Sequence, residues 1–229
     1  NLAISAANDD PLRIMLVAVE PSGDALGAAL LCELKKIRGP KAVFSGCGGP
    51  LMQAEGFETL FPIDRLSVMG VTDALRAIPE GRRRAAELVR HAAQEKTAAI
   101  VLIDGWAFSR AVAERLRARK LRARLFKLAA PQVWASRPQR MKAVKRLFDG
   151  VVCLLPFEPA IFQKAGVKAA FVGNPNFQAA WAARGDGAAF RLRHGIGDAP
   201  LLLVLPGSRK GEIAQHLAPF GGATRLLAE

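Results

Sequence analysis

The chain has 229 residues, of which 51% are apolar and 23% charged, with 33 lysines and arginines against 20 aspartates and glutamates. This composition excludes a disordered or collagen-like chain, because the apolar side chains are numerous enough to offset the entropy lost on ordering a core. No apolar run approaches the roughly 18 residues of a membrane-spanning helix, so none is predicted.

Short apolar runs alternate along the chain with longer helical periods, which is typical of a parallel sheet covered by helices. The runs that predict strands are 13–19, 41–45, 98–103, 122–128, 151–155, 169–172 and 201–205. The segments that predict helices are 25–37, 71–78, 81–94, 110–119, 137–147, 159–165, 177–183 and 212–228. We therefore expect an α/β fold with a doubly wound sheet.

Four glycines interrupt the helical pattern near residues 184–200. We expect an N-terminal domain over 1–184, a linker over 185–199 and the start of a second domain over 200–229. This last stretch offers one strand, one turn and one helix, which cannot cover both faces of a sheet. Because the chain also begins at Asn1 without methionine, we expect a fragment, or a prematurely ended product, of a longer protein.

The net charge of +13 is concentrated in the middle of the chain. Residues 81–150 hold 18 basic and 5 acidic side chains, whereas residues 1–80 and 151–229 come to −3 and +3. A localised basic surface favours an anionic partner such as nucleic acid, an anionic membrane or a phosphorylated substrate. Solvated helix faces explain the imbalance equally well, so charge alone leaves both interpretations open.

Cysteine and histidine offer no cluster of metal ligands. Cys32, Cys47 and Cys153 are too scattered for a disulfide framework or a zinc site. Residues 1–12 lack the basic region of a signal peptide. We therefore predict a protein of the reducing cytoplasm that uses no metal and no cofactor.

The first predicted strand leads into Glu20-Pro21-Ser22-Gly23-Asp24 at the start of a helix. Ser22 and Asp24 are suited to cap this helix, and Gly23 permits a tight turn. The helix start attracts anions, but the two carboxylates oppose a bare phosphate, so a sugar hydroxyl suits the loop better. Plain capping is the simpler interpretation of this loop taken alone.

Asp104 directly follows the apolar strand 98–103. In an open parallel sheet the ligand crevice lies at the carboxyl ends of the strands, where Asp104 falls. A carboxylate at this place can take a proton from an attacking hydroxyl. The alternative role, capping a helix that starts near Arg110, is disfavoured because Asp104 lies early for it.

Two turns are unusual in composition, and one of them suggests a ligand. Residues 130–137 follow a strand, but their residues indicate no particular role. In residues 205–212, Gly207 and Ser208 leave backbone amides open and Arg209 offers a planar fork for phosphate. An ordinary helix start is disfavoured because cations oppose the helix dipole there.

Val71, Leu75 and Ile78 share one face of a predicted helix that runs into three consecutive arginines, residues 82–84. An apolar stripe beside arginines is typical of a helix bound to the surface of an anionic membrane. An amphipathic helix packed on a core is about as compatible with this pattern.

The order of these motifs resembles the lipid-A-disaccharide synthases, membrane-associated glycosyltransferases of Gram-negative bacteria. The matching segments occur in the family's order and at close to its spacing, and they are 20–24, 49–56, 68–70, 103–104, 131–135, 155–158 and 205–209. The resemblance covers residues 13–229. It implies a GT-B architecture with a Rossmann-like N-terminal domain and an incomplete second Rossmann-like domain.

The resemblance implies an inverting, metal-independent transfer of 2,3-diacylglucosamine from its UDP-linked form onto 2,3-diacylglucosamine 1-phosphate, giving a β-1,6-linked disaccharide and UDP. By this resemblance Asp104 is the base that deprotonates the acceptor's 6-hydroxyl, and Arg209 holds a phosphate group. The further residues implied to contact substrate are Glu20, Ser22, Gly23 and Ser208.

The resemblance also implies a location at the cytoplasmic face of the inner membrane and a homodimer for a full-length chain. The sequence departs from the family's usual residues at Val19, Trp106, Ala107 and Asn174. It ends before most of the second domain, where the family mainly binds UDP, so we expect little turnover from this chain alone.

A second hypothesis is a non-catalytic basic module that binds anionic membrane or nucleic acid. It predicts steep salt dependence of nucleic-acid binding and indifference to Asp104→Ala. The absence of tyrosine and the scatter of the 12 phenylalanines give little support to a base-stacking surface. We therefore expect no nucleic-acid partner.

Overall fold

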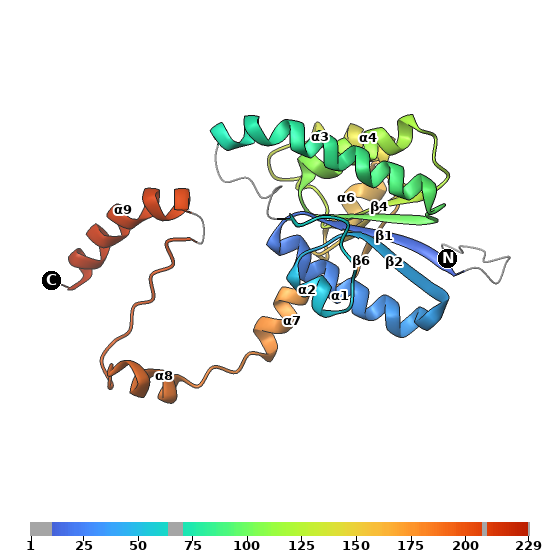
Figure 1. Cartoon of the computed structure of the whole chain (residues 1–229). Helices are drawn as coiled ribbons and strands as arrows, with labels where there is room; N and C mark the ends of the chain where they lie inside the picture. The colour runs from blue at the N-terminus through green and yellow to red at the C-terminus, as the bar shows by residue number, and fades with distance from the viewer. Residues whose placement is uncertain (1–10, 64–70, 208–209, 229) are drawn as a thin grey trace. The chain divides into compact units, whose positions relative to one another are not determined.

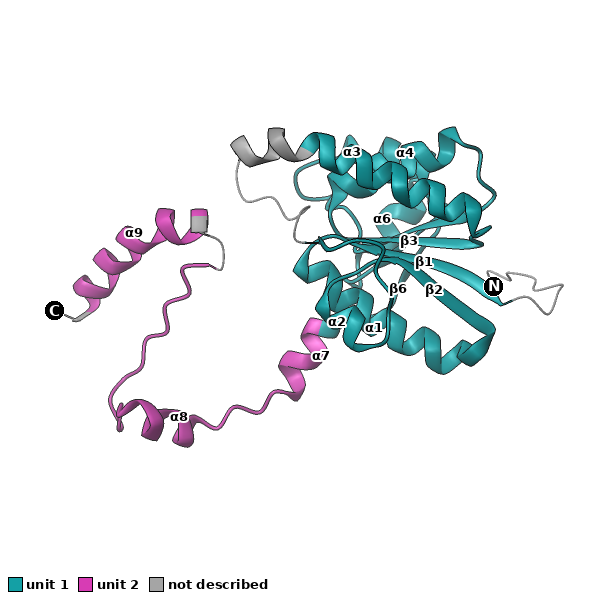
Figure 2. Ribbon diagram, viewed as in Figure 1, with its two compact units in different colours: residues 1–67, 76–175 teal, residues 68–75, 176–229 magenta. Residues whose placement is uncertain are grey.

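The computed structural model describes residues 11–63, 71–207 and 210–228, with the backbone alone at 71–77, 210 and 228. The chain forms two compact units (Figure 2). Unit 1 comprises residues 1–67 and 76–175, and unit 2 comprises residues 68–75 and 176–229.

Unit 1 contains a six-stranded parallel sheet in the order β2-β1-β3-β4-β5-β6. The strands are β1 (Leu12–Ala18), β2 (Ala42–Cys47), β3 (Ala99–Ile103), β4 (Arg124–Leu128), β5 (Gly150–Cys153) and β6 (Ala169–Phe171). All five residues of β3 are buried, as expected for a strand covered on both faces. The predicted α/β Rossmann-like fold is confirmed, with the first six predicted strands close to their predicted limits.

Helices cover both faces of this sheet (Figure 1). One face carries α1 (Pro21–Arg38) and α2 (Pro50–Ala54), and the other carries the later part of α3 (Val71–Gln94) with α4 (Trp106–Ala118), α5 (Arg140–Leu147) and α6 (Glu158–Lys164). The alternation along β1 shows why both faces are needed. Leu16 packs in the cluster that includes Leu31 of α1, whereas Met15 packs in the cluster that includes Leu88 of α3.

Asp24 is a buried carboxylate that joins α1 to α2. It accepts hydrogen bonds from the backbone N–H groups of Gly49 (2.8 Å), Leu51 (2.9 Å) and Met52 (3.1 Å). These amides lie at the start of α2, where the helix offers them no acceptor. The predicted capping of α1 by Ser22 and Asp24 is therefore wrong, because Asp24 caps the neighbouring helix and no side chain caps the start of α1.

The sequence pattern misplaced one helix boundary and one strand. The helices predicted over 71–78 and 81–94 form the single helix α3, which accommodates Pro79 in its interior with the loss of one backbone donor. Residues 201–205 form no strand. A strand needs a neighbour for its backbone hydrogen bonds, and the described part of unit 2 contains no other strand.

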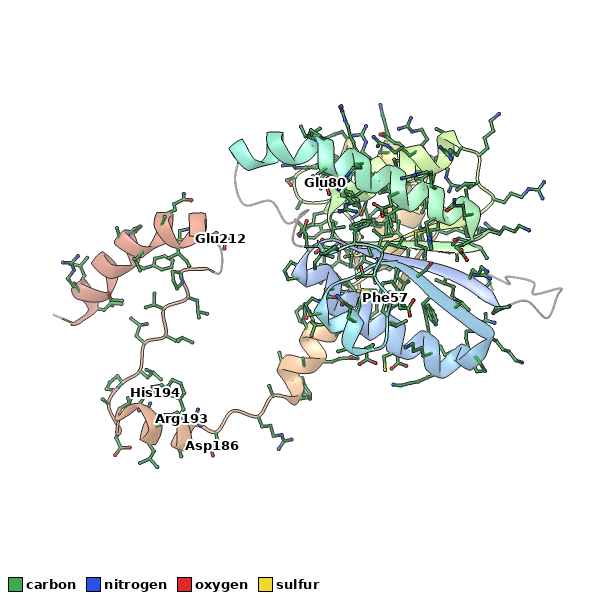
Figure 3. All side chains as sticks on the ribbon, viewed as in Figure 1. Phe57, Glu80, Asp186, Arg193, His194 and Glu212 are labelled. Atoms are coloured by element: carbon green, nitrogen blue, oxygen red, sulfur yellow. The ribbon has the colours of Figure 1, made fainter. Side chains whose placement is uncertain are left out.

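The C-terminal region contains α7 (Pro175–Ala182), α8 (Gly187–His194) and α9 (Lys210–Ala228). No residue of α7 or α8 is buried. Figure 3 shows Asp186 and His194 at the two ends of α8, and Asp186 Oδ1 accepts a hydrogen bond of 2.9 Å from the Ala189 N–H. The boundary between the compact units follows Pro175, and the predicted domain limits stay a prediction. Within the described residues, no helix combines the length and the apolar character needed to cross a membrane.

Replacing Asp24 by Ala will lower the free energy of unfolding by about 3 kcal/mol, because two buried N–H groups and one partly buried N–H group lose a charged acceptor. Urea denaturation followed by circular dichroism measures this loss. Asp186→Ala is the matched control, since it removes one cap from the exposed helix α8. Equal losses in the two variants would show that Asp24 has no special role in holding unit 1 together.

Candidate functional site

The strand order reverses between β1 and β3, which lie side by side in the sheet. Ligands of open α/β sheets bind outside the carboxyl ends of such strands, because the connections leave them on opposite sides. A cavity of about 600 Å³ lies at this place, a size suited to a small-molecule ligand. Its lining includes Glu20, Asp104, Trp106, Lys127, Gln132, Arg137, Arg140, Glu158 and Asn174.

Asp104 lies in the left-handed region of backbone conformation, with φ of 49°, and Gly105 follows with φ of 45°. Such a conformation costs about 1–3 kcal/mol outside glycine and persists only where the surroundings hold it. The Asp104 N–H donates to the Leu128 carbonyl over 3.1 Å, and the Asp104 carbonyl accepts the Ser109 hydroxyl over 2.7 Å. These bonds hold the turn that carries the carboxylate into the cavity wall.

The loop after β1 contacts the Asp104 side chain. Ser22 Oγ donates a hydrogen bond of 2.6 Å to Asp104 Oδ2. A Cβ at Gly23 would lie 3.4 Å from both Asp104 Cβ and the Ile103 carbonyl oxygen, so the backbone at Gly23 packs close to Asp104. Glu20 lines the same cavity. The structure thus brings Glu20, Ser22 and Gly23 together with Asp104, and no side chain caps the start of α4, contrary to the capping alternative.

Lys127 is a charged residue of this site to which the sequence analysis gave no role. Its side chain is 1% exposed, and Nζ donates to the carbonyls of Asp104 (2.7 Å), Leu128 (2.9 Å) and Leu102 (3.4 Å). Three carbonyls match the three N–H donors of an ammonium. Burial lowers the pKa of Lys127 to about 7, opposed by the charges of Asp104 and Glu20. The available sequence signal was a lysine between Phe126 and Leu128 in the apolar second half of β4.

The wall contributed by the segment after β4 is basic. Arg137 and Arg140 both line the cavity, and Arg140 Cζ lies 5.4 Å from the ring centroid of Trp106. Partial burial, and then the neighbouring charge of Arg137, lower the pKa of Arg140. Arg137 ends the unusual turn 130–137. This turn lies beside the site because it follows β4, and β4 pairs with β3, the strand that precedes Asp104.

Glu158 connects the turns that follow β4 and β5. It is buried, its Oε1 accepts a 3.3 Å hydrogen bond from Trp134 Nε1, and its Oε2 accepts a 3.1 Å bond from the Leu155 N–H. Both turns contribute residues to the cavity lining. Glu158 therefore fixes the wall of the cavity on the β5 side.

Several predicted site residues cannot be placed. Ser208 and Arg209 lie outside the described residues, and so do the side chains of Val71 and Leu75. Ile78 is 44% exposed. The residues described contain no cluster of three or more His, Cys, Asp or Glu arranged to hold a metal ion.

The strand order and the cavity at its reversal define a Rossmann-like α/β domain, the kind from which GT-B glycosyltransferases are built. The family model described as lipid-A-disaccharide synthetase matches residues 14–229, and the chain belongs to this family.

Named relatives agree with this assignment. Lipid-A-disaccharide synthases from Paramagnetospirillum magneticum, Ruegeria pomeroyi and Rhodospirillum centenum are 45%, 41% and 40% identical to the chain, over 95%, 93% and 95% of its length. The matches cover 56%, 53% and 54% of those proteins. The chain thus spans about half the length of the curated relatives it matches.

Replacing Lys127 by Met will change how stability depends on pH. Between about pH 7 and 10 the unfolded chain holds the Lys127 proton and the folded chain has released it. The free energy of unfolding of the unchanged protein will therefore rise with pH relative to Lys127→Met, by up to about 1.4 kcal/mol per pH unit. Urea denaturation at several pH values measures the difference. Lys142→Met, at an exposed site on α5, is the control. Parallel pH profiles of stability for all three proteins would contradict the lowered pKa of Lys127.

Proposed function

We propose that this chain provides the acceptor-binding side of a lipid-A-disaccharide synthase. The proposed reaction transfers 2,3-diacylglucosamine from its UDP-linked form onto the 6-hydroxyl of 2,3-diacylglucosamine 1-phosphate, with inversion and without a metal. The observation that carries the proposal is the Asp104 carboxylate, held in a left-handed turn beside the cavity where the strand order reverses.

In this reaction Asp104 acts as a general base. It takes the proton of the acceptor's 6-hydroxyl while that oxygen bonds to the anomeric carbon of the donor, and the bond from this carbon to UDP breaks on the opposite face. The hydrogen bond from Ser22 fixes one carboxylate oxygen and so orients the group. A general base in this position raises the rate by a factor of about 10²–10⁴.

The remaining predicted contacts complete the proposal. Glu20 lines the cavity and Ser22 bonds to Asp104, and with Gly23 they form the proposed acceptor side, where Glu20 and Ser22 offer partners for sugar hydroxyls. Arg209, with Ser208 beside it, holds a phosphate of UDP. A guanidinium suits this role because its planar fork matches phosphate oxygens and its charge offsets the negative charge of the leaving group.

The alternative of a basic module for nucleic acid has less support. Several arginines of the middle third form ion pairs within unit 1. These pairs are Arg83 and Arg84 with Glu80, Arg84 with Glu87, Arg110 and Arg146 with Glu114, and Arg117 with Asp149. Glu80, labelled in Figure 3, thus pairs with two of the three consecutive arginines. Charges paired in this way attract phosphate less strongly.

Asp104→Asn tests the base directly. Residues 1–229 are joined to the unmatched C-terminal part of the P. magneticum relative, and transfer of radiolabelled diacylglucosamine is measured. Turnover of the variant will fall by a factor of about 10²–10⁴, because the amide cannot accept the proton. Glu114→Gln, at a surface carboxylate of α4, is the control and will keep its turnover. Full turnover of Asp104→Asn, or no transfer by the unsubstituted chimera, would refute the proposed reaction.

We also propose that Val71, Leu75 and Ile78 of α3 bind the membrane surface in which both acylated substrates lie. Ile78 is 44% exposed, and the arginines at 82–84 follow it by one turn. Replacing all three by Ser will weaken binding to phosphatidylglycerol vesicles about tenfold or more, measured by cosedimentation. Ile37→Ser removes an apolar side chain that is 73% exposed on α1 and will leave binding unchanged. Equal binding by the triple variant and the unchanged chain would exclude this surface.

A further inference from the structure

The cavity of unit 1 has an acidic side and a basic side. Glu20 and Asp104 follow the neighbouring strands β1 and β3, whereas Arg137 and Arg140 follow β4, the next strand in the sheet. All four side chains line the same cavity. This arrangement suits a ligand that presents hydroxyls at one end and an anionic group at the other.

Unlike several other arginines of unit 1, the two arginines of the cavity form no ion pair among the described residues. Arg84 and Arg117 lie 2.8–2.9 Å from carboxylate oxygens. In the described part of the chain, no carboxylate lies within 4.0 Å of Arg137 or Arg140. Partial burial is the main cause of the lowered pKa of Arg140, and repulsion by the neighbouring charge of Arg137 adds to it. A bound anion would relieve this repulsion.

Trp106 supports Arg140 without using its hydrogen-bond donors. The guanidinium lies over the indole ring at 5.4 Å from the centroid, a cation–π contact. The guanidinium N–H groups lie in its plane, so contact with a ring on one face leaves these donors for a ligand. Arg140 is only partly exposed, and Arg137 is exposed at the rim. In this pair the guanidinium of Arg140 is positioned by Trp106, and the guanidinium of Arg137 is accessible to solvent.

We propose that Arg137 and Arg140 form a phosphate subsite that holds the 1-phosphate of the acceptor sugar, with Asp104 facing the 6-hydroxyl of the same sugar. This inference rests on the proposed function and assigns the acceptor's orientation within it. The phosphate on C1 and the hydroxymethyl group on C5 are attached on either side of the ring oxygen, so the two groups point in different directions from one edge of the sugar. With the phosphate fixed on the β4 side, the 6-hydroxyl is left to face Asp104 at the end of β3. Two guanidiniums match a phosphate dianion in charge and supply paired N–H donors to its oxygens.

Isothermal titration of the 229-residue chain with 2,3-dibutyrylglucosamine 1-phosphate, a soluble short-chain acceptor, tests the subsite. Arg137→Gln and Arg140→Gln will each weaken binding about tenfold, a loss of about 1.4 kcal/mol. Arg146→Gln is the matched control, because this exposed arginine on α5 pairs with Glu114 instead. Thermal unfolding of each variant confirms that the fold is retained. No binding by the unchanged chain, or unchanged binding by the double variant, would overturn the proposal.

Three further ligands identify what the arginines recognise. Dibutyrylglucosamine without phosphate will bind at least about tenfold more weakly than the 1-phosphate, and equal affinity would overturn the subsite. Inorganic phosphate will bind more weakly than the sugar phosphate. Equal affinity would show that the sugar adds nothing to binding and would overturn the assignment of the subsite to the acceptor. UDP that displaces the sugar phosphate through Arg137 and Arg140 would assign the pair to the donor instead and overturn the proposal.

The subsite and the proposed reaction can fail separately. The reaction is tested by the turnover of the chimera that carries Asp104→Asn, whereas the subsite is tested by the acceptor affinity of Arg137→Gln and Arg140→Gln. If that chimera keeps its turnover but binding still depends on the arginines, the reaction is wrong and the subsite stands. If Asp104→Asn abolishes turnover but Arg137→Gln and Arg140→Gln leave the acceptor KM unchanged, the subsite is wrong and the reaction stands.

Discussion

The contact between the buried Lys127 side chain and the Asp104 turn is the interaction on which the site depends. A buried lysine is unfavourable unless its N–H groups find acceptors, and a left-handed aspartate is unfavourable unless its backbone is held. The hydrogen bonds from Nζ to the carbonyls of Asp104 and Leu128 meet both requirements at once. The carboxylate consequently has a defined position at the point where the strand order reverses.

Buried polar groups hold the surrounding loops by the same means. Asp24 binds three amides at the start of α2, and Glu158 connects the turns after β4 and β5. Each group accepts hydrogen bonds from backbone or indole N–H groups that are buried or partly buried. The cavity wall is therefore built from loops that are attached to one another as well as to the sheet. Such loops are suited to orienting a sugar, because little rearrangement is needed when the ligand binds.

All residues that line the cavity belong to unit 1, so the proposed acceptor site is formed by this unit. On the basic side of this cavity the ring of Trp106 supports Arg140.

The α/β class, six of the strands and the position of Asp104 at a strand end could be predicted from the sequence, because these features follow from local apolar patterns. Which loops meet could not be predicted, because it depends on how the strands pair in the folded chain. Lys127, Arg137 and Arg140 became site residues through the pairing of β3 with β4, and Asp24 found its amides 25 to 28 residues away. Likewise, residues 201–205 have the composition of a strand but lack a neighbouring strand. Hydrogen-bond partners and neighbouring charges come from segments distant along the chain, and local patterns do not record them.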